Sequence, residues 1–275
     1  MRIAVTGANG DLGSTLVPYL SEKGHTVVSI DRSLPAYQKP FGTTQHYVVD
    51  VRNFGEVIAS LEGCDAVIHL AAHRSPLTMP APVVYAENTA GSFNVLFAAA
   101  TLGIGRVCMA SSINAIGGAF SRAPRYDYFP LDEHHPSYAE DPYSLSKWVL
   151  EQQGDAIARR YQNLAIASLR FHWLLESRER AVQLSEEFSV LAVRHLWAYT
   201  LMLDACRACL LSVTTDFSGH ESFYIVAPQT CANEETAALC KKYYSGTEIR
   251  KELAGHHGFF DCSKAAQILG WHHQE

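Results

Sequence analysis

A short apolar segment that runs directly into three regularly spaced glycines stands at the start of the chain and limits the folds open to it. Residues 2–5 are mostly apolar and read as a buried parallel strand. Gly7, Gly10 and Gly13 follow, and apolar side chains then recur at helical spacing as far as Leu20. A strand that turns straight into a helix directs free N–H groups and the positive end of the helix dipole at the space above the turn. This segment therefore predicts a strand–turn–helix unit with an anion-binding turn.

The glycines have separate roles in that prediction. Gly7 permits the tight turn, Gly10 lets a phosphate approach the backbone, and Gly13 lets the helix pack on the strand. The spacing is G-x-x-G-x-x-G rather than the commoner G-x-G-x-x-G, and the alternative is a glycine-rich turn without a ligand. Asp31 ends a second apolar strand 18 residues after Gly13, where an acid would bind the ribose of a dinucleotide. A carboxylate there repels a 2′-phosphate, so NAD is favoured over NADP although Arg32 follows.

Composition excludes several classes of protein. The chain has 275 residues, 48% of them hydrophobic and 18% charged, which suffices for one large domain or a domain with a lobe. The formal net charge of -6 argues against a nucleic-acid partner. No apolar run reaches the length of a membrane span, and Met1 leads into the first strand. We therefore expect neither a membrane partner nor a signal peptide.

The cysteines and histidines do not form a recognisable framework. Seven cysteines are an odd and scattered set, so we expect free thiols and a cytoplasmic location. Cys206 and Cys209 lie three apart, and histidines are paired at 256–257 and 272–273. None of these has a partner at the spacing of a metal site, so we expect no metal.

Alternating strand and helix patterns run to about residue 170 and predict an α/β fold, a Rossmann-type doubly wound parallel sheet. Pro35, Pro40 and Gly42 mark the connection after the second strand. Residues 117–140 are rich in glycine, proline and aromatic residues and are expected to form a long loop over the catalytic region. We expect strands at 2–6, 26–30, 46–49, 66–70, 106–110 and 164–170, and helices at 11–23, 53–61, 83–101 and 142–161.

The pattern weakens after residue 172 and predicts a small C-terminal substrate lobe. We expect a helix around 190–211, a strand at 223–226 and a helix at 233–244. The predicted division is an NAD-binding domain, 1–171, that carries the catalytic residues, and a substrate-binding lobe, 172–275, interleaved with the sheet.

A tyrosine and a lysine in the expected helix 142–161 point to proton transfer. Tyr143 and Lys147 are four residues apart, so their side chains share one helix face. A free tyrosine titrates at about 10, and a nearby ammonium together with a positive nicotinamide ring would lower that pKa. Ser111 or Ser112 would donate a hydrogen bond to a substrate oxygen or to the phenolate. The alternative is a core aromatic in a chance Y-x-x-x-K pair, but its place after the fifth strand of a dinucleotide domain favours catalysis.

Further short segments of the chain fit one family pattern. Together with the glycine turn and the Tyr143/Lys147 pair, they make the chain resemble the extended short-chain dehydrogenases/reductases of the NAD-dependent epimerase/dehydratase family over essentially its whole length. These segments are residues 50–51, 69–72, 88–96, 112–117, 169–171, 260–265 and 269–271.

The resemblance implies a role for individual residues. It makes Ser112 the catalytic serine beside Tyr143 and Lys147, with Ser111 a neighbour. It places Asp50 and Val51 at the adenine and lets Ala71 and Ala72 line the nicotinamide side. The expected cofactor-binding set is Gly7, Asn9, Gly10, Asp11, Leu12, Gly13, Asp31, Arg32, Asp50, Val51, Leu70, Ala71, Ala72, Asn88, Ala110, Tyr143, Lys147 and Phe171.

The chain leaves the family pattern after the sixth strand. Nucleotide-sugar epimerases of this family continue there with an asparagine and a glycine-proline-arginine stretch, whereas this chain has His172 and then Trp173 in place of the asparagine. A tryptophan supplies apolar area and one donor rather than a diphosphate contact. The short chain also implies a reduced lobe, so both facts point away from a UDP-sugar. Within the family, size and serine segment are similar to those of uronate dehydrogenases, which oxidise a free sugar acid.

Seven residues are candidates for contact with a small-molecule substrate. Those from the loop could instead be exposed arginines and packing aromatics, and the histidines could be core or surface residues. The candidates are His73, Ser111, Asn114, Arg125, Tyr126, His172 and Trp173.

The leading hypothesis is an NAD-dependent oxidoreductase that transfers hydride from a secondary alcohol or sugar-type hydroxyl to NAD, with Tyr143 as base. One alternative is a sugar or nucleotide-sugar epimerase/dehydratase with transient oxidation. A second is a non-catalytic NAD-sensing protein, for which we would expect a damaged Ser/Tyr/Lys set. The resemblance further implies a homodimer through helices 83–101 and 142–161, with apolar residues such as Phe93 and Trp148 in the interface.

Overall fold

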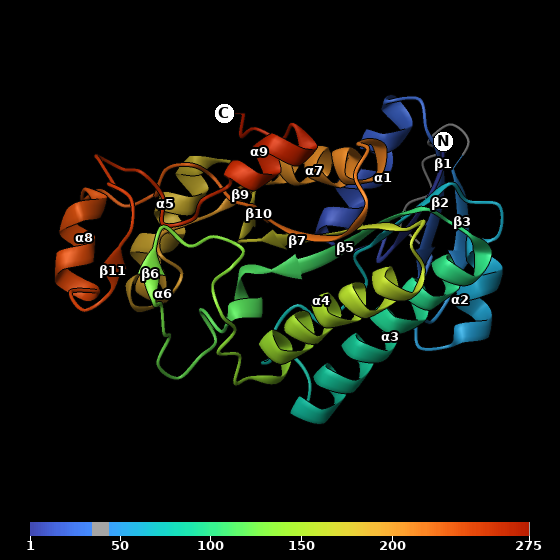
Figure 1. Ribbon diagram of the computed structural model, residues 1–275, viewed down its shortest axis with the longest axis horizontal. Helices are drawn as coiled ribbons and strands as arrows, with labels where there is room; N and C mark the ends of the chain where they lie inside the picture. Colours follow the sequence, from blue (N-terminus) through green and yellow to red (C-terminus); the bar gives the residue numbers. More distant parts are fainter. Residues whose placement is uncertain (35–43, 275) are drawn as a thin grey trace.

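A seven-stranded parallel sheet forms the centre of the molecule, with helices on both faces (Figure 1). The computed structural model describes residues 1–34 and 44–274, so the predicted connection at Pro35, Pro40 and Gly42 lies outside the described residues. In the sheet the strands follow the order β10-β7-β5-β4-β1-β2-β3. They are β1 (Arg2–Thr6), β2 (Thr26–Asp31), β3 (Gln45–Val48), β4 (Ala66–His69), β5 (Arg106–Ser112), β7 (Ala165–Phe171) and β10 (Gly219–Ile225).

The order of the strands reverses beside β1, because the chain runs outward to β2 and β3 on one side and to β4, β5, β7 and β10 on the other. All neighbouring strands are parallel, so their carboxyl ends lie at one edge of the sheet. Ligands of open α/β sheets bind at that edge, beside the reversal of strand order. The predicted doubly wound parallel sheet is confirmed.

Two layers of helices bury the two faces of the sheet (Figure 1). Buried side chains of one layer pack with β1, β4, β5, β7 and β10, and those of the other pack mainly on β2, β4, β5 and β7. The first layer consists of α1 (Asp11–Glu22), α7 (Met202–Thr214) and α9 (Ser263–Leu269), and the second of α2 (Phe54–Leu61), α3 (Ala81–Leu102) and α4 (Pro142–Arg160).

The predicted helix around 190–211 is wrong as a single element. Helix α6 (Ser189–Arg194) ends early, and the chain turns through Leu196 and Trp197, whose φ angles are 56° and 48°. A left-handed conformation at two non-glycine residues breaks a helix, and here the burial of both side chains in the lobe core holds it. The chain then forms β9 (Thr200–Leu201) before α7 begins.

The C-terminal segment builds a second core and also completes the first. Strand β10 pairs with β7 over seven residues, and α7 and α9 cover the sheet. The loop 117–140 reaches into the second core, where Tyr126 and Phe129 are buried. The lobe's elements are η1 (Ile113–Ile116), β6 (Tyr128–Phe129), β8 (Leu174–Leu175), α5 (Arg178–Glu187), α6, β9, α8 (Thr236–Tyr243) and β11 (Glu248–Ile249).

Three expectations from composition can be compared with the described residues. All seven cysteines lie in the described part of the chain and are free thiols, six of them buried. No helix in residues 1–34 and 44–274 is long and apolar enough to cross a bilayer. Over the same residues, no group of three or more histidine, cysteine, aspartate or glutamate side chains is arranged to hold a metal ion.

Helix α4 approaches β10 most closely at Gly154, which gives a test of the packing. A Cβ at Gly154 would lie 2.8 Å from Cδ2 of His220, and that ring is hydrogen-bonded at 2.8 Å both to Ser168 and to Asp155, so it cannot move aside cheaply. Gly154→Ala gains helix propensity of about 1 kcal/mol but overpacks the contact by about 1–3 kcal/mol. We expect a net loss in the free energy of unfolding, measured by urea denaturation.

The matched control is Gly55→Ala in α2, where the nearest atom to an added Cβ is Asn53 Oδ1 at 3.4 Å. Without a clash, this variant should be unchanged or up to about 1 kcal/mol more stable. If both variants gained stability equally, the close approach of α4 to β10 would be wrong.

Candidate active site

The turn between β1 and α1 has the geometry of an anion site. Gly7 has φ of +70°, and a Cβ on it would lie 2.6 Å from the backbone N of Ala71. A Cβ on Gly13 would lie 2.2 Å from the Gly7 carbonyl oxygen, so the first turn of α1 packs directly on the end of β1. Gly10 is the N-cap of α1, and no described side chain caps the helix there. The free N–H groups of this helix end fit a pyrophosphate.

Asp31 lies at the carboxyl end of β2 beside the glycine turn. Its carboxylate accepts hydrogen bonds from the backbone N–H of Asn9 at 3.0 Å and of Arg32 at 2.7 Å, so its orientation is fixed. The Asn9 side chain donates to the Ser33 carbonyl at 2.6 Å. The Arg32 side chain is 63% exposed and lies 4.0 Å from Glu87. The structure thus brings Asn9, Asp31 and Arg32 together at the predicted ribose position.

Charged side chains surround the predicted adenine position. Asp50 holds Arg52 with both carboxylate oxygens, and these hydrogen bonds keep the pKa of Asp50 below its usual value. Arg52 also pairs with Glu87, whose pKa is lowered first by its hydrogen bond with His73. His73 Nε2 lies 2.8 Å from Glu87. The predicted substrate residue His73 therefore belongs to this ion network.

The segment after β4, which holds the predicted cofactor residues Leu70, Ala71 and Ala72, lies against the glycine turn, since a Cβ on Gly7 would meet Leu70 and Ala71. The N–H of Leu70 donates to the Thr6 carbonyl at 3.0 Å, which continues the β1–β4 ladder. Asn88 from α3 is buried, accepts from the N–H of His73 at 2.8 Å and donates to its carbonyl at 3.1 Å. Asn88 thus holds the segment in place with its side chain.

Four more predicted cofactor residues lie on or against α1, α3 and β7. Leu12 and Phe171 are buried in the first core. Val51 packs on Gly91, since a Cβ there would lie 2.9 Å from its Cγ2. Asp11 pairs with Arg74, a cation from the segment after β4 that the sequence did not single out.

The catalytic candidates Ser112, Tyr143 and Lys147 come together where α4 begins against the end of β5. Asp141 caps α4 by accepting from the N–H of Tyr143 at 3.0 Å, which fixes the tyrosine at the first turn. Lys147 Nζ donates to the Ala110 carbonyl at 2.7 Å and lies 5.7 Å from the centre of the Tyr143 ring.

Burial dominates the protonation of both α4 residues. It raises the pKa of Tyr143, and a hydrogen bond with Ser112 opposes that change. Burial lowers the pKa of Lys147 to about 8, opposed by the charge of Glu151. The lysine is therefore mainly protonated at neutral pH. The sequence predicted a lowered Tyr143 pKa with both ammonium and nicotinamide present, and the protein groups alone do not supply it.

The loop 117–140 reaches the catalytic candidate Tyr143, in keeping with its predicted place over this region. The Phe120 ring packs edge-on against Tyr143 at 5.7 Å between centres. Asn114 donates to Ser112 Oγ at 3.3 Å and accepts from the N–H of Ala119 at 2.8 Å. Asn114 therefore joins the catalytic serine to the loop.

The other substrate candidates are engaged within the protein. Tyr126 is buried and donates its hydroxyl to the Arg194 carbonyl at 2.8 Å. Arg125 pairs with Asp127 at 2.8 Å on the surface. The structure therefore does not bring either beside Tyr143 through a described contact.

The aromatic residues after β7 form a stack of their own. Trp173 lies 4.2 Å from His195 between ring centres. His172 is buried, accepts from the N–H of Trp173 at 2.6 Å and lies 3.0 Å from the His195 carbonyl. Burial first of all lowers the pKa of His172 well below its usual value, so this ring is neutral. Of the two candidates after β7, His172 is buried and Trp173 is half-buried, so only Trp173 keeps an exposed surface.

The sequence missed two buried residues beside the site, Glu151 and Arg170. They form an ion pair at 2.7 Å in which each side chain is at most 7% exposed. Ser111, a predicted substrate residue, donates to Glu151 at 2.6 Å. The sequence offered a signal for Glu151, because this residue lies four positions after Lys147 and therefore on the same face of α4.

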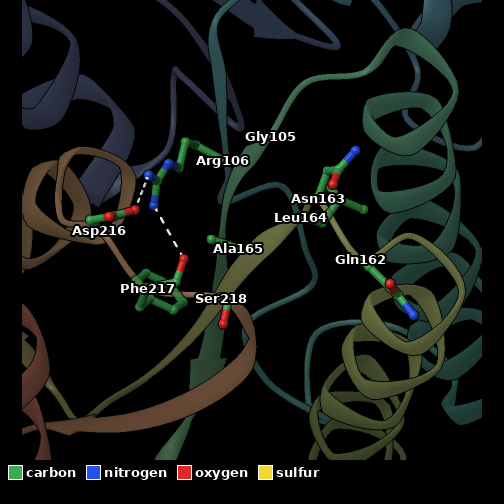
Figure 2. Close-up of a pocket in the computed structure, with 9 residues that line it drawn as sticks. All are labelled: Gly105, Arg106, Gln162, Asn163, Leu164, Ala165, Asp216, Phe217 and Ser218. Atoms are coloured by element: carbon green, nitrogen blue, oxygen red, sulfur yellow. Dashed lines mark hydrogen bonds and ion pairs between the residues drawn. The ribbon is translucent and has the colours of Figure 1, made fainter.

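Two hollows of the surface lie away from these residues. One, of about 260 Å³, lies at the amino ends of β5, β7 and β10, the opposite edge of the sheet (Figure 2). The positively charged residue in its lining is Arg106, whose guanidinium donates hydrogen bonds to Asp216 and to the Thr215 carbonyl. The other, of about 370 Å³, lies beyond β10 between Val226 and the C-terminal residues Trp271 to His273. Neither adjoins Tyr143.

Known proteins match the chain over most of its length. A putative dihydroflavonol 4-reductase of Synechocystis sp. is 30% identical over 60% of this chain, and the chain spans about half of that relative, 47%. The L-arabinose 1-dehydrogenase (NAD(P)(+)) of Haloferax volcanii is 31% identical over 71% of this chain and 76% of that protein. A solved structure of a mutated uronate dehydrogenase is 21% identical with a TM-score of 0.70, covering 100% of this chain and 82% of that chain, which supports the fold.

The family model of the NAD dependent epimerase/dehydratase family matches residues 3–180, which include the glycine turn, the serines and the Tyr143/Lys147 pair. The predicted family and its cofactor class are thereby confirmed. By its sequence, its parallel sheet and the arrangement of these residues, the chain belongs to the NAD dependent epimerase/dehydratase family.

Proposed function

We propose that this protein is an NAD-dependent oxidoreductase that oxidises a secondary hydroxyl of a small sugar or sugar acid. The observation that carries the proposal is the intact set of Ser112, Tyr143 and Lys147 at the carboxyl edge of the sheet, next to a dinucleotide-type turn. Such a set serves proton removal from an alcohol.

Each residue of the set has one role in the proposed reaction. Tyr143, as phenolate, accepts the proton of the substrate hydroxyl. Ser112 donates a hydrogen bond to the same oxygen and is itself oriented by Asn114. The Lys147 ammonium, fixed on the Ala110 carbonyl, stabilises the phenolate charge. Bound NAD supplies the hydride acceptor, its nicotinamide ring.

The residues that would hold NAD are those of the predicted set. The N-terminus of α1 would take the pyrophosphate, and Asp31 the adenosine ribose. Asp50 and Val51 would lie at the adenine, and Lys147 would also bind the nicotinamide ribose.

A free sugar is favoured over a nucleotide-sugar by the chain after β7. Trp173, which stands where nucleotide-sugar epimerases of the family have an asparagine, stacks on His195. The arabinose dehydrogenase relative, matched over three quarters of its length, acts on a free sugar by its name. The candidates His73, Asn114, Arg125, Tyr126 and Trp173 remain proposals for substrate contact.

A sugar or nucleotide-sugar epimerase/dehydratase is the second candidate, favoured by the family itself. It uses the same proton removal and then returns the hydride. A panel of L-arabinose, other aldoses, uronic acids and UDP-glucose with NAD separates the two, because a dehydrogenase accumulates NADH and an epimerase does not. A protein that binds NAD but converts nothing would instead be an NAD sensor, and one that does not bind NAD would contradict all three.

The division into an NAD-binding domain, 1–171, and a substrate lobe, 172–275, is part of the proposal. The second hydrophobic core, which contains Trp197, Tyr199 and Phe259, supports a separate lobe. We also propose a cytoplasmic location, supported by the seven free thiols, and cell fractionation tests it.

Loss of the tyrosine hydroxyl tests the chemistry. For Tyr143→Phe we expect kcat to fall by about 10²–10⁴ with the best sugar, since the proton acceptor is gone. NAD affinity, measured by calorimetry, should stay within a few-fold of the wild type. Tyr161→Phe, at the far end of the same helix, is the control and should keep full activity. Full turnover in Tyr143→Phe would exclude this tyrosine as the base.

Removal of the Asp31 charge tests cofactor choice. For Asp31→Asn we expect NAD binding to weaken about tenfold, because a charge-assisted hydrogen bond is lost, and NADP binding to improve as repulsion ends and the exposed Arg32 remains. Asp65→Asn, an acid at the amino end of β4, is the control. Calorimetric titration with both nucleotides measures the ratio, and an unchanged ratio would contradict the assignment.

A homodimer through α3 and α4 is also proposed. Phe93 on α3 is 45% exposed, stacks on Phe97 and shares the helix pair with Trp148 of α4, 37% exposed. A second copy would cover this aromatic face. We expect a dimer mass by light scattering for the wild type and a monomer for Phe93→Glu/Trp148→Glu, while Leu203→Glu, on an exposed part of α7, should stay dimeric. A monomeric wild type would contradict the proposal.

A further inference from the structure

The end of β5 is joined to α4 at three consecutive residues. The Ala110 carbonyl accepts from Lys147 at 2.7 Å, and the Ser111 hydroxyl donates to Glu151 at 2.6 Å. Ser112 shares a side-chain hydrogen bond with Tyr143. The three helix residues lie four apart, so one face of α4 meets one strand end with a tyrosine, a lysine and a glutamate in succession.

Glu151 is fixed more firmly than its neighbours on that face. Both of its oxygens are bonded by Arg170, at 2.9 Å from Nε and 2.7 Å from Nη2. Arg170 is the register partner of Ser111 across the β5–β7 pair, so helix and both strands meet at one carboxylate. The Arg170 guanidinium also lies 5.0 Å from the centre of the Tyr224 ring on β10.

Burial of this pair requires a reason beyond stability. Replacement of a buried ion pair by apolar side chains is often neutral or stabilising, so such a pair adds little to the fold. Glu151 does have a second charged neighbour, since Lys147 lies one helical turn away on the same buried face. A carboxylate at that place stabilises the ammonium in a site shielded from water.

We propose that Glu151 is a positioning residue for the catalytic set, held by Ser111 and Arg170 so that its charge keeps the Lys147 ammonium protonated beside Tyr143. The inference rests on the proposed function for its catalytic consequence. It assigns Ser111 to the support of Glu151 rather than to substrate.

The other groups that face Lys147 do not replace this charge. His69 on β4 is buried, hydrogen-bonded to Thr6 at 2.7 Å and neutral, since burial lowers its pKa to about 3. Tyr143 adds no negative charge in its protonated form, which burial favours by raising its pKa. Arg170 and His220 lie around Glu151 itself. Beyond Tyr224 lies the half-buried Glu133, whose carboxylate accepts a hydrogen bond from the Tyr224 N–H at 2.8 Å.

The sign of the effect follows from these charges. In the wild type, burial lowers the pKa of Lys147 to about 8, and the charge of Glu151 opposes that change. Without the carboxylate the pKa falls further. The active form, with a protonated lysine, is then lost at a lower pH, so the basic limb of kcat/KM against pH moves down.

The experiment is carbon-13 NMR of the full chain labelled at lysine Cε, titrated with pH, with the Lys147 signal assigned by its loss in Lys147→Arg. We expect Glu151→Gln to lower the Lys147 midpoint by about one pH unit, the size of a single opposite-charge effect. The basic limb of the activity profile should move by the same amount. Asp155→Asn, one turn further along α4 and paired with His220, is the matched control and should leave the midpoint in place.

A second variant guards against loss of the fold. Glu151→Gln leaves the Arg170 charge unpaired, whereas Glu151→Gln/Arg170→Met buries no charge and should fold. Its Lys147 midpoint should also lie below that of the wild type, because the carboxylate that raises the pKa of Lys147 is absent from this variant as well.

The outcomes separate the two proposals. A protein that oxidises none of the sugars contradicts the proposed function, while the lysine titration still reports on Glu151. A Lys147 midpoint that is unchanged in both variants overturns the inference, even if thermal stability falls, because that result would make the ion pair a purely structural one.

Discussion

The contact of α4 with the carboxyl end of β5 is the interaction on which the site depends. Every catalytic candidate is either on the first turns of this helix or at the end of this strand, and the N-cap at Asp141 fixes where the helix begins. A shift of α4 by one residue would turn Tyr143 and Lys147 away from Ser112, since successive helix residues are 100° apart. The close approach at Gly154 anchors the far end of the helix on β10. The catalytic geometry is thus set by packing at both ends of one helix.

Much of the sheet could be predicted because parallel strands buried on both faces are apolar runs with clear boundaries. The segment around Trp197 could not, since its two left-handed residues are held by burial in the lobe core, a long-range cause that no local pattern contains. The short strands of the lobe share this origin. Strand β6, at Tyr128–Phe129, pairs with β11 more than a hundred residues later, and each has only two residues. A segment of two residues is too short for its strand propensity to predict a strand.

The candidate site also contains residues that local patterns place and contacts that they do not predict. Helical spacing placed Tyr143 and Lys147 on one face of a helix, and the strand–turn–helix pattern placed the glycines in the turn, because both depend on residues close in sequence. The hydroxyl of the substrate candidate Tyr126 donates to the carbonyl of Arg194, 68 residues later, a contact that its loop alone does not predict. The partner of Glu151 lies on a strand, 19 residues on, and only the fold shows that the two side chains meet. Sequence patterns therefore do not predict which side chains of different helices and strands are in contact.

The chemistry and the substrate preference therefore rest on different parts of the chain. The proposed proton transfer depends on the α4–β5 contact and the turn after β1, and both lie in the segment that matches the family. The proposed substrate surface begins after β7, where His172, Trp173 and His195 pack on one another with neutral rings. The exposed part of this stack is the Trp173 indole, an apolar surface without charge, and we propose that it favours the face of a sugar ring over a diphosphate. We propose that a change at Trp173 alters which sugar is oxidised, because this residue follows β7, whereas the catalytic candidates lie on α4 and at the end of β5.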